Sequence, residues 1–220
     1  MPFFTKTTKL YQEFRRIDEN AHHTMVRFYE ANAQDIISSK FDIYFEILVN
    51  YAHALFEIGA YSKHIKAADE LIKLSIQYNI QFYNGEDIYY KSLFQKAAAL
   101  YNLMQYQKAK HIIQELIKID PYHSLAIRFL QKCLHKIEPS YWKTARASAI
   151  ALFLLTTVLI AIDVLFVLPF MPQWADFIEY FRWSIFSIGI LVLGGTYLFH
   201  YLQTRRQVIA FVEKARRAKG

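Results

Sequence analysis

The chain has 220 residues, of which 54% are apolar, and a formal net charge of +7. Residues 1–140 hold 17 Lys and Arg against 15 Asp and Glu, whereas residues 141–220 hold 9 against 4, beside two long apolar runs. Because the basic excess flanks apolar segments and gathers on no face of a polar domain, it is typical of a membrane protein and argues against nucleic-acid binding.

Amphipathic patterns with the period of a helix run through most of the first 140 positions, and strand-like alternation is scarce. Asn20, Gly59, residues 79–85 and Asp120-Pro121 separate these patterns, as turn residues do. The spacing predicts an all-α domain of antiparallel helical hairpins. The expected helices are residues 7–18, 24–38, 41–58, 62–77, 86–103, 106–119 and 122–136.

Two of the expected hairpins share a sequence pattern: LFEIGAYSKH at residues 55–64 parallels LYNLMQYQKA at residues 100–109. The shared positions are a small residue in the first helix and a turn residue with Tyr two positions later: Ala52 and Ala97, Gly59 and Met104, and Tyr61 and Tyr106. The second unit also ends in a proline, Pro121. This pattern resembles the tetratricopeptide repeat over about residues 45–121, with residues 122–137 as a further first helix. It departs from the family in the 45-residue spacing from Gly59 to Met104, in the lack of an opening Trp, and in His64 at a usually small position.

The resemblance implies a solenoid of hairpins whose first helices line a groove for a peptide or a partner helix. The mixture of aromatic, amide and charged side chains expected there suits peptide capture. The groove residues are expected to be Asn50, His53, Phe56, Glu57, Lys91, Phe94, Gln95, Tyr101, Asn102 and Arg128. Asn50, Lys91 and Arg128 meet the family's carboxylate clamp only in part, and packing within the hairpins is the competing interpretation for every groove position.

Residues 147–168 and 183–202 are apolar runs, each long enough to cross a hydrocarbon layer of about 30 Å. Lys and Arg flank the outer ends of this pair, whereas the connecting segment holds two acidic residues and one Arg, so the positive-inside rule places both termini in the cytoplasm. The lack of an apolar secretory run at the start favours the bacterial inner membrane.

The chain is therefore expected to have a cytoplasmic repeat domain (1–138), a transmembrane hairpin (139–204) and a basic cytoplasmic tail (205–220). The tail fits either an amphipathic helix on an anionic leaflet or a charged end of the second span.

Asp163 is a carboxylate inside the first predicted span, where an unpaired charge is costly. Because Asp163 lies nine residues before Pro172 and Arg182 ten after it, the sequence predicts an ion pair at similar depth that fixes the hairpin register. Ser184 and Ser187 are its expected secondary partners. Small residues that would let helices pack closely, between the spans or between copies of the chain, are Ala147, Ala151, Gly189, Gly194 and Gly195.

The sequence contains no Gly-rich phosphate loop, no histidine pair at metal-ligand spacing and only one cysteine, Cys133. We therefore expect no enzymatic activity, metal or cofactor. The leading expectation is a membrane-anchored adaptor that binds a protein or peptide partner at the cytoplasmic face. The alternative is an accessory subunit of a membrane transport or secretion complex that acts through its transmembrane hairpin.

Overall fold

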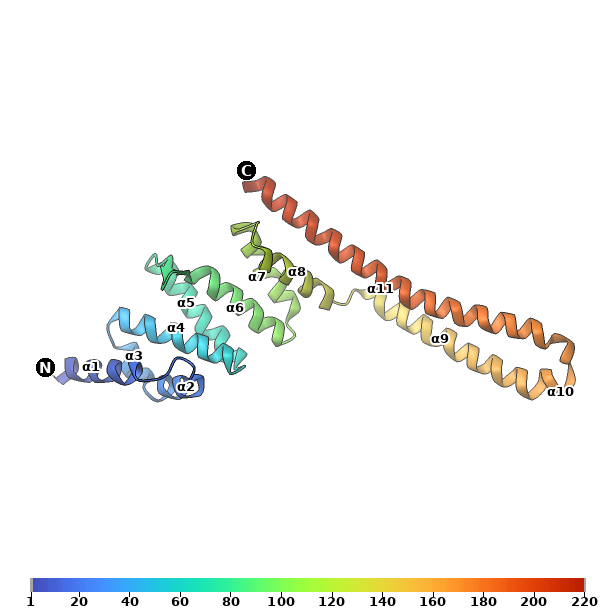
Figure 1. The fold of residues 1–220 in the computed structure, drawn as a ribbon, viewed down its shortest axis with the longest axis horizontal. Coiled ribbons are helices and arrows are strands. Elements are labelled where there is room, and N and C mark those ends of the chain that lie inside the picture. Colours follow the sequence, from blue (N-terminus) through green and yellow to red (C-terminus); the bar gives the residue numbers. More distant parts are fainter. Residues whose placement is uncertain (1, 220) are drawn as a thin grey trace. The chain divides into compact units, whose positions relative to one another are not determined.

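The computed structural model describes the backbone of residues 2–219, and the side chains of residues 9–219 except Pro172 and Ala175. The described chain is all-α apart from one short β-hairpin (Figure 1). It divides into two compact units, one made of residues 1–133 with 215–220 and the other of residues 134–214.

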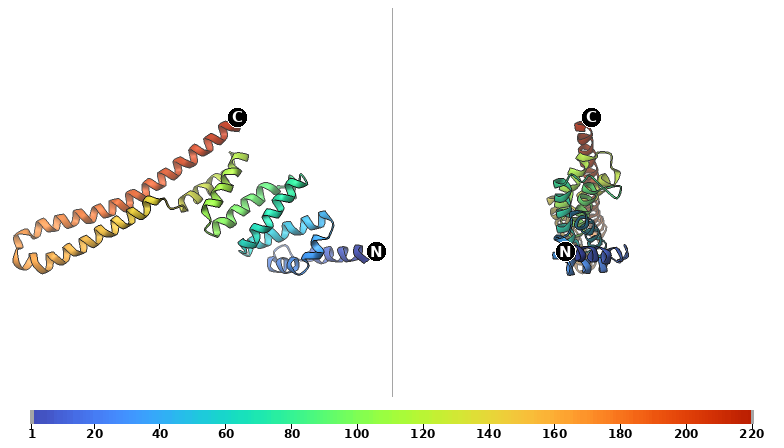
Figure 2. Two further views of the ribbon diagram at one scale, coloured as in Figure 1. Left: turned by 180° about the vertical axis from the view of Figure 1, so that it is seen from behind. Right: turned by 90° about the vertical axis from the view of Figure 1, so that its left-hand side faces the viewer.

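The first unit is built from short antiparallel helices, with α4 against α5, α5 against α6, and α6 against α7 (Figure 2). Six of the seven predicted helices are confirmed, with ends shifted by up to five residues. Their bounds are α1 Pro2–Arg15, α2 His22–Ala31, α3 Ala33–Ile37, α4 Phe41–Glu57, α5 Tyr61–Gln77, α6 Ile88–Asn102, α7 Tyr106–Ile119 and α8 Ser124–Lys136.

The helix expected over residues 24–38 is wrong in one respect, because it breaks at Asn32 into α2 and α3. The Asn32 side-chain amide donates to the Phe28 carbonyl at 2.9 Å, and its backbone N–H bonds the carbonyls of Phe28 and Tyr29. An Asn side chain that bonds nearby backbone in this way competes with helix continuation.

The helix expected to begin at residue 86 begins at Ile88, because residues 82–87 form a β-hairpin of β1 (Phe82–Tyr83) and β2 (Glu86–Asp87). Asn84 and Gly85 form its turn with φ of 50° and 80°, the left-handed pair that a type I′ turn needs. The Asp87 side chain then accepts a hydrogen bond from the Tyr90 N–H and caps α6.

The turns after α4 and α6 have the same geometry. Gly59 and Met104 both have left-handed backbone, with φ of 76° and 59°. In each turn the next N–H bonds a carbonyl five residues back, from Ala60 to Leu55 and from Gln105 to Leu100, both at 2.9 Å. This is the Schellman ending, and it reverses the chain within three residues.

The core of the first unit is continuous along α4, where Ile47 and Leu55 are fully buried among residues of α1 to α3 and α5. Ile113 and Leu116 of α7 are also fully buried. Since these buried positions recur three and four residues apart, each helix has one apolar face, which holds it in the layer.

The second unit is a helical hairpin. Its first arm is α9 (Ser140–Ile162), continued by the π-helical turn η1 (Asp163–Val167) and by α10 (Leu168–Phe170). After the 3-10 turn η2 (Pro172–Trp174), the second arm is α11 (Ala175–Lys219), which belongs to this unit as far as residue 214.

Both arms are long and apolar enough to cross a membrane, over residues 140–170 and 176–219. Only 17% of the most apolar stretch of each arm is buried within the protein, whereas the core helix of a soluble protein is mostly buried. α11 runs through residue 204 without a break, so residues 205–219 continue the helix that contains the second apolar run.

Candidate functional site

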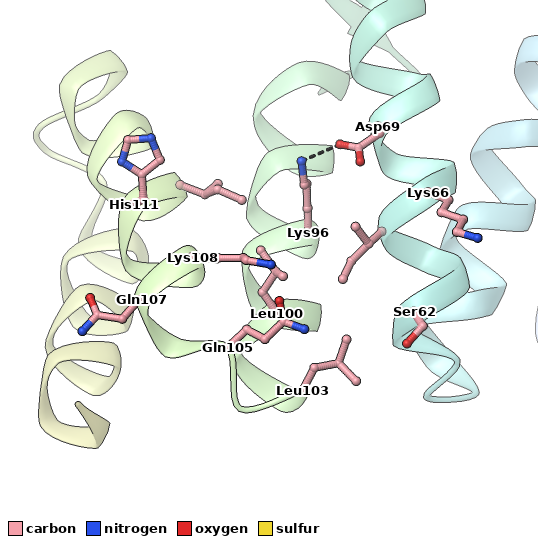
Figure 3. A pocket seen from close by; sticks show the side chains of 12 residues that line it. Ser62, Lys66, Asp69, Lys96, Leu100, Leu103, Gln105, Gln107, Lys108 and His111 are labelled. Atoms are coloured by element: carbon pink, nitrogen blue, oxygen red, sulfur yellow. Dashed lines mark hydrogen bonds and ion pairs between the residues drawn. The ribbon is translucent and has the colours of Figure 1, made fainter. Parts of the chain in front are cut away.

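A cavity of about 770 Å³ lies between α5, α6 and α7 (Figure 3). Its apolar lining residues are buried or half-buried and form its floor: Ile65, Leu100, Leu103 and Ile112. Its polar lining residues are mostly exposed and form its rim: Ser62, Lys66, Asp69, Lys96, Gln105, Gln107, Lys108 and His111. An apolar floor with a polar rim is the usual build of a protein-binding surface.

The rim of the cavity is positively charged. Lys96 forms an ion pair with Asp69, with 2.5 Å between Nζ and Oδ1 (Figure 3). Lys66 and Lys108 form no ion pair with any residue that the structure describes, and both are exposed. The rim thus carries three Lys and a single carboxylate, which one of the Lys neutralises.

Helical spacing brings the lining residues to one surface. Ser62, Ile65 and Asp69 recur three and four residues apart on α5, as do Lys108 and His111 on α7. The turn at residues 103–105 contributes Leu103 and Gln105. None of the ten predicted groove residues lines this cavity. Its lining comes mostly from the second helices of the two hairpins, whose polar positions carried no signal beyond that of an exposed helix face.

The predicted groove residues of α4 bond mainly within their own hairpin. The Asn50 amide donates to the Glu46 carbonyl at 2.8 Å, one turn back on the helix. The Phe56 ring lies 5.8 Å from Tyr61 and 5.2 Å from His64, so it packs into the hairpin.

His53 is half-buried and Glu57 is exposed. Nδ1 of His53 lies 4.0 Å from Oε1 of Glu57. The His53 ring also lies 5.7 Å from that of His22. Burial lowers the pKa of His53, and the neighbouring Glu57 carboxylate opposes that shift.

The predicted groove residues of α6 divide between ion pairing and aromatic packing. Lys91 pairs with Glu86 of the β-hairpin. Phe94 and Tyr101 lie 5.6 and 5.4 Å from the Phe129 ring of α8. Gln95 is half-buried, while Asn102 and Arg128 are exposed. Packing therefore accounts for the two aromatic positions of α6, and the charged and amide positions stay accessible.

His64 occupies a fully enclosed site between the two helices of the first hairpin. Its exposed fraction is 1%, and its Nδ1 lies 2.8 Å from the Ala52 carbonyl oxygen. That short contact assigns the proton to Nδ1, while Nε2 is buried without a hydrogen-bond partner in the described structure. Burial lowers the pKa of His64, and the hydrogen bond to Ala52 only partly offsets this. His64 is thus a neutral core residue.

Cys133 is fully buried in α8, and burial raises the pKa of its thiol to about 11. A thiol in this state is a small apolar core residue with little nucleophilic character. Within the described residues, no three His, Cys, Asp or Glu side chains lie close enough to hold a metal ion.

In the hairpin unit, Arg182 and Asp163 form the predicted ion pair, with 3.3 Å between Nη1 of Arg182 and Oδ2 of Asp163. Asp163 is 7% exposed and opens the π-helical turn η1. Its other oxygen, Oδ1, is buried without a partner among the described residues. Ser184 does not reach this pair, because its hydroxyl donates to the Tyr180 carbonyl of its own helix at 2.8 Å.

The small residues of the hairpin have different surroundings. A Cβ atom added at Gly189 would lie 2.8 Å from Cε1 of Phe153, so this glycine lets α11 approach α9. A Cβ atom at Gly194 or Gly195 would meet nothing within 4 Å. Of the three predicted helix-packing glycines, only Gly189 contacts the other arm.

A cluster at the base of the hairpin was not predicted from the sequence. His200 is 6% exposed, and its ring lies 5.6 Å from His135 and 5.4 Å from Trp142. The Tyr141 hydroxyl lies 3.4 Å from Nδ1 of His200 and donates to Oε1 of Gln203 at 3.1 Å. The cluster ties the start of α9 to α11, and neither its spacing of about 60 residues nor its mixed composition is a recognisable motif.

Comparisons with models of protein families, with curated proteins and with solved structures give no match for this chain.

Proposed function

We propose that the protein is a membrane-anchored adaptor, whose helical domain binds a protein partner at the cytoplasmic surface of a bilayer. The observation that carries the proposal is the exposure of the two apolar arms, because an apolar surface of this length needs lipid or protein to cover it. Leu154 and Leu191 are each more than 60% exposed, in the middle of these arms.

Anchoring gives the helical domain its proposed role. A domain held at a membrane meets membrane partners at a raised effective concentration, so even weak binding is productive. The basic ends of the hairpin favour a cytoplasmic position for both termini, in the bacterial inner membrane by preference. The repeated Schellman turns at Gly59 and Met104 support a tetratricopeptide-repeat-like solenoid for α4 to α7, a build suited to protein binding.

The adaptor proposal is tested by exchanging the anchor. A chimera replaces residues 143–214 by an unrelated two-span hairpin and so keeps all of the first unit. A photo-crosslinking residue in the helical domain reports the partner in intact membranes. We expect full-length protein to resist carbonate extraction, and the chimera to form the same crosslinked species. Release of the full-length protein by carbonate would refute the anchoring.

A second candidate, an accessory subunit of a transport or secretion complex, is favoured by the buried Asp163 with an unpaired oxygen. Ionisable groups within a span commonly mark functional positions. If the chimera loses the crosslink or the cellular activity that the full-length protein supports, this candidate replaces the adaptor.

A further inference from the structure

We propose that the cavity between α5, α6 and α7 is the partner site, and that it binds an acidic amphipathic helix presented by the partner protein. The inference rests on the proposed adaptor function and deepens it. It places the site on the second helices of the hairpins, away from the predicted groove residues of α4 and α6.

The charge of the rim argues for an acidic occupant. Asp69 is already paired with Lys96, so the carboxylate does not compensate Lys66 or Lys108. Lys66 on α5 and Lys108 on α7 both line the cavity. The Lys108 side chain points into it, whereas the exposed Lys66 side chain is turned away from α6 and α7 and must rotate to reach a ligand there (Figure 3). Glu or Asp side chains of a ligand would pair with both, and a basic ligand would be repelled.

The apolar floor of the cavity argues for an amphipathic occupant. Leu100 and Ile112 are buried or half-buried at the bottom of the cavity, between the polar walls. A volume of about 770 Å³ admits several aliphatic side chains. A helix that presents leucines at intervals of three and four residues, with acidic residues beside them, matches both the floor and the rim. Since packed helices lie about 8–10 Å apart, a ligand that spans α5 to α7 needs about 14 residues at 1.5 Å each.

The test uses the full chain in nanodiscs of phosphatidylcholine, a zwitterionic lipid with no net charge, and two fluorescent peptides of about 14 residues. One carries leucines at helical spacing with glutamates on the other positions, and the other replaces each glutamate by lysine. Fluorescence anisotropy at about 0.15 M salt, where the screening length is about 8 Å, measures both affinities. We expect the glutamate peptide to bind at least about tenfold more tightly than the lysine peptide.

The variant Lys66→Glu/Lys108→Glu reverses both free charges of the rim. Because each reversed charge repels a glutamate of the peptide instead of pairing with it, we expect the affinity for the glutamate peptide to fall about tenfold or more. The matched control is Lys73→Glu/Lys118→Glu, which makes the same charge change on the same two helices at residues that do not line the cavity. It should bind within about twofold of the unmodified protein. Leu103→Ala removes part of the apolar floor and should weaken the binding of both peptides.

Three results would overturn the inference: no measurable binding of the glutamate peptide, equal binding of both peptides, or equal losses in the rim variant and its control. A loss confined to Lys91→Glu/Arg128→Glu would move the site to the predicted groove and leave the adaptor function intact. Unchanged helicity and unfolding temperature, measured by circular dichroism, identify the variants that fold.

Discussion

The Arg182 guanidinium lies 3.3 Å from the carboxylate of Asp163, and the two residues belong to opposite arms of the hairpin. The contact fixes the register of α9 against α11, because sliding either arm by one turn would separate the charges by about 5 Å. It also explains how a carboxylate is accommodated in an otherwise apolar segment.

Removing either partner of this pair should destabilise the hairpin. We expect Arg182→Leu and Asp163→Leu each to lower the free energy of unfolding by about 2 kcal/mol, since each leaves a charge buried without its partner and Arg182 keeps some exposure. The double variant should lose clearly less than the sum of the two. Unfolding by SDS in mixed micelles, followed by tryptophan fluorescence, gives the coupling. Additive losses would show that the pair contributes nothing to hairpin assembly.

Gly189 and Gly194 provide a matched test of arm packing. We expect Gly189→Val to lower hairpin stability by about 1–3 kcal/mol, because the added atoms meet the Phe153 ring. Gly194→Val adds the same atoms where nothing lies within 4 Å, so it should leave the hairpin unchanged. The SDS unfolding assay applies here too. An equal effect of both substitutions would mean that helix backbone effects, and not the contact with Phe153, govern stability.

The two Schellman turns predict stability changes of opposite sign. Left-handed backbone costs an L-residue about 1 kcal/mol, so Gly59→Ala should destabilise the helical unit by about that amount. Met104→Gly should stabilise it by about 0.5–1 kcal/mol, since Met104 has the same left-handed φ and its side chain is 76% exposed. Thermal unfolding monitored by circular dichroism reports both. Met104→Ala is the control, because it removes the side chain and keeps the strain.

His64 should make the helical unit acid-sensitive. Burial lowers its pKa in the folded state, so between that value and the unfolded value of about 6.5 the unfolded chain binds more protons. The stabilisation is therefore complete above about pH 6.5 and is lost as the pH falls towards the folded pKa, with a slope of up to about 1.4 kcal/mol per pH unit. His64→Asn should flatten the fall in unfolding free energy between about pH 7 and pH 5. His111→Asn, at an exposed residue, should retain it.

Local sequence signals predicted most of the helices, since amphipathic period and turn residues are properties of neighbouring positions. They failed where a side chain bonds its own backbone, as at Asn32, which splits one expected helix into two. The ion pair of Asp163 and Arg182 could be predicted by counting residues from the hairpin turn. In two regular helices, residues at the same number of positions from the turn lie at similar depth.

The cavity between α5 and α7 could not be predicted in the same way. Its lining runs from Lys66 on α5 to Lys108 on α7, and the distance between these two helices depends on how α6 packs between them. A family pattern instead directed attention to the first helices, where Phe94 and Tyr101 pack against Phe129. A sequence pattern identifies which face of a helix is polar or apolar, whereas a cavity between helices depends on how far apart their backbones lie.

The burial of Cys133 has a practical consequence. Because this thiol is fully enclosed and its pKa is raised to about 11, maleimide reagents should leave the native chain unmodified at neutral pH. A cysteine introduced at exposed Gln173, between the arms, or at exposed Gln105, in the helical unit, would then be the sole labelling position. Impermeant and permeant maleimides applied to whole cells would report the sidedness of each position without prior removal of the native cysteine.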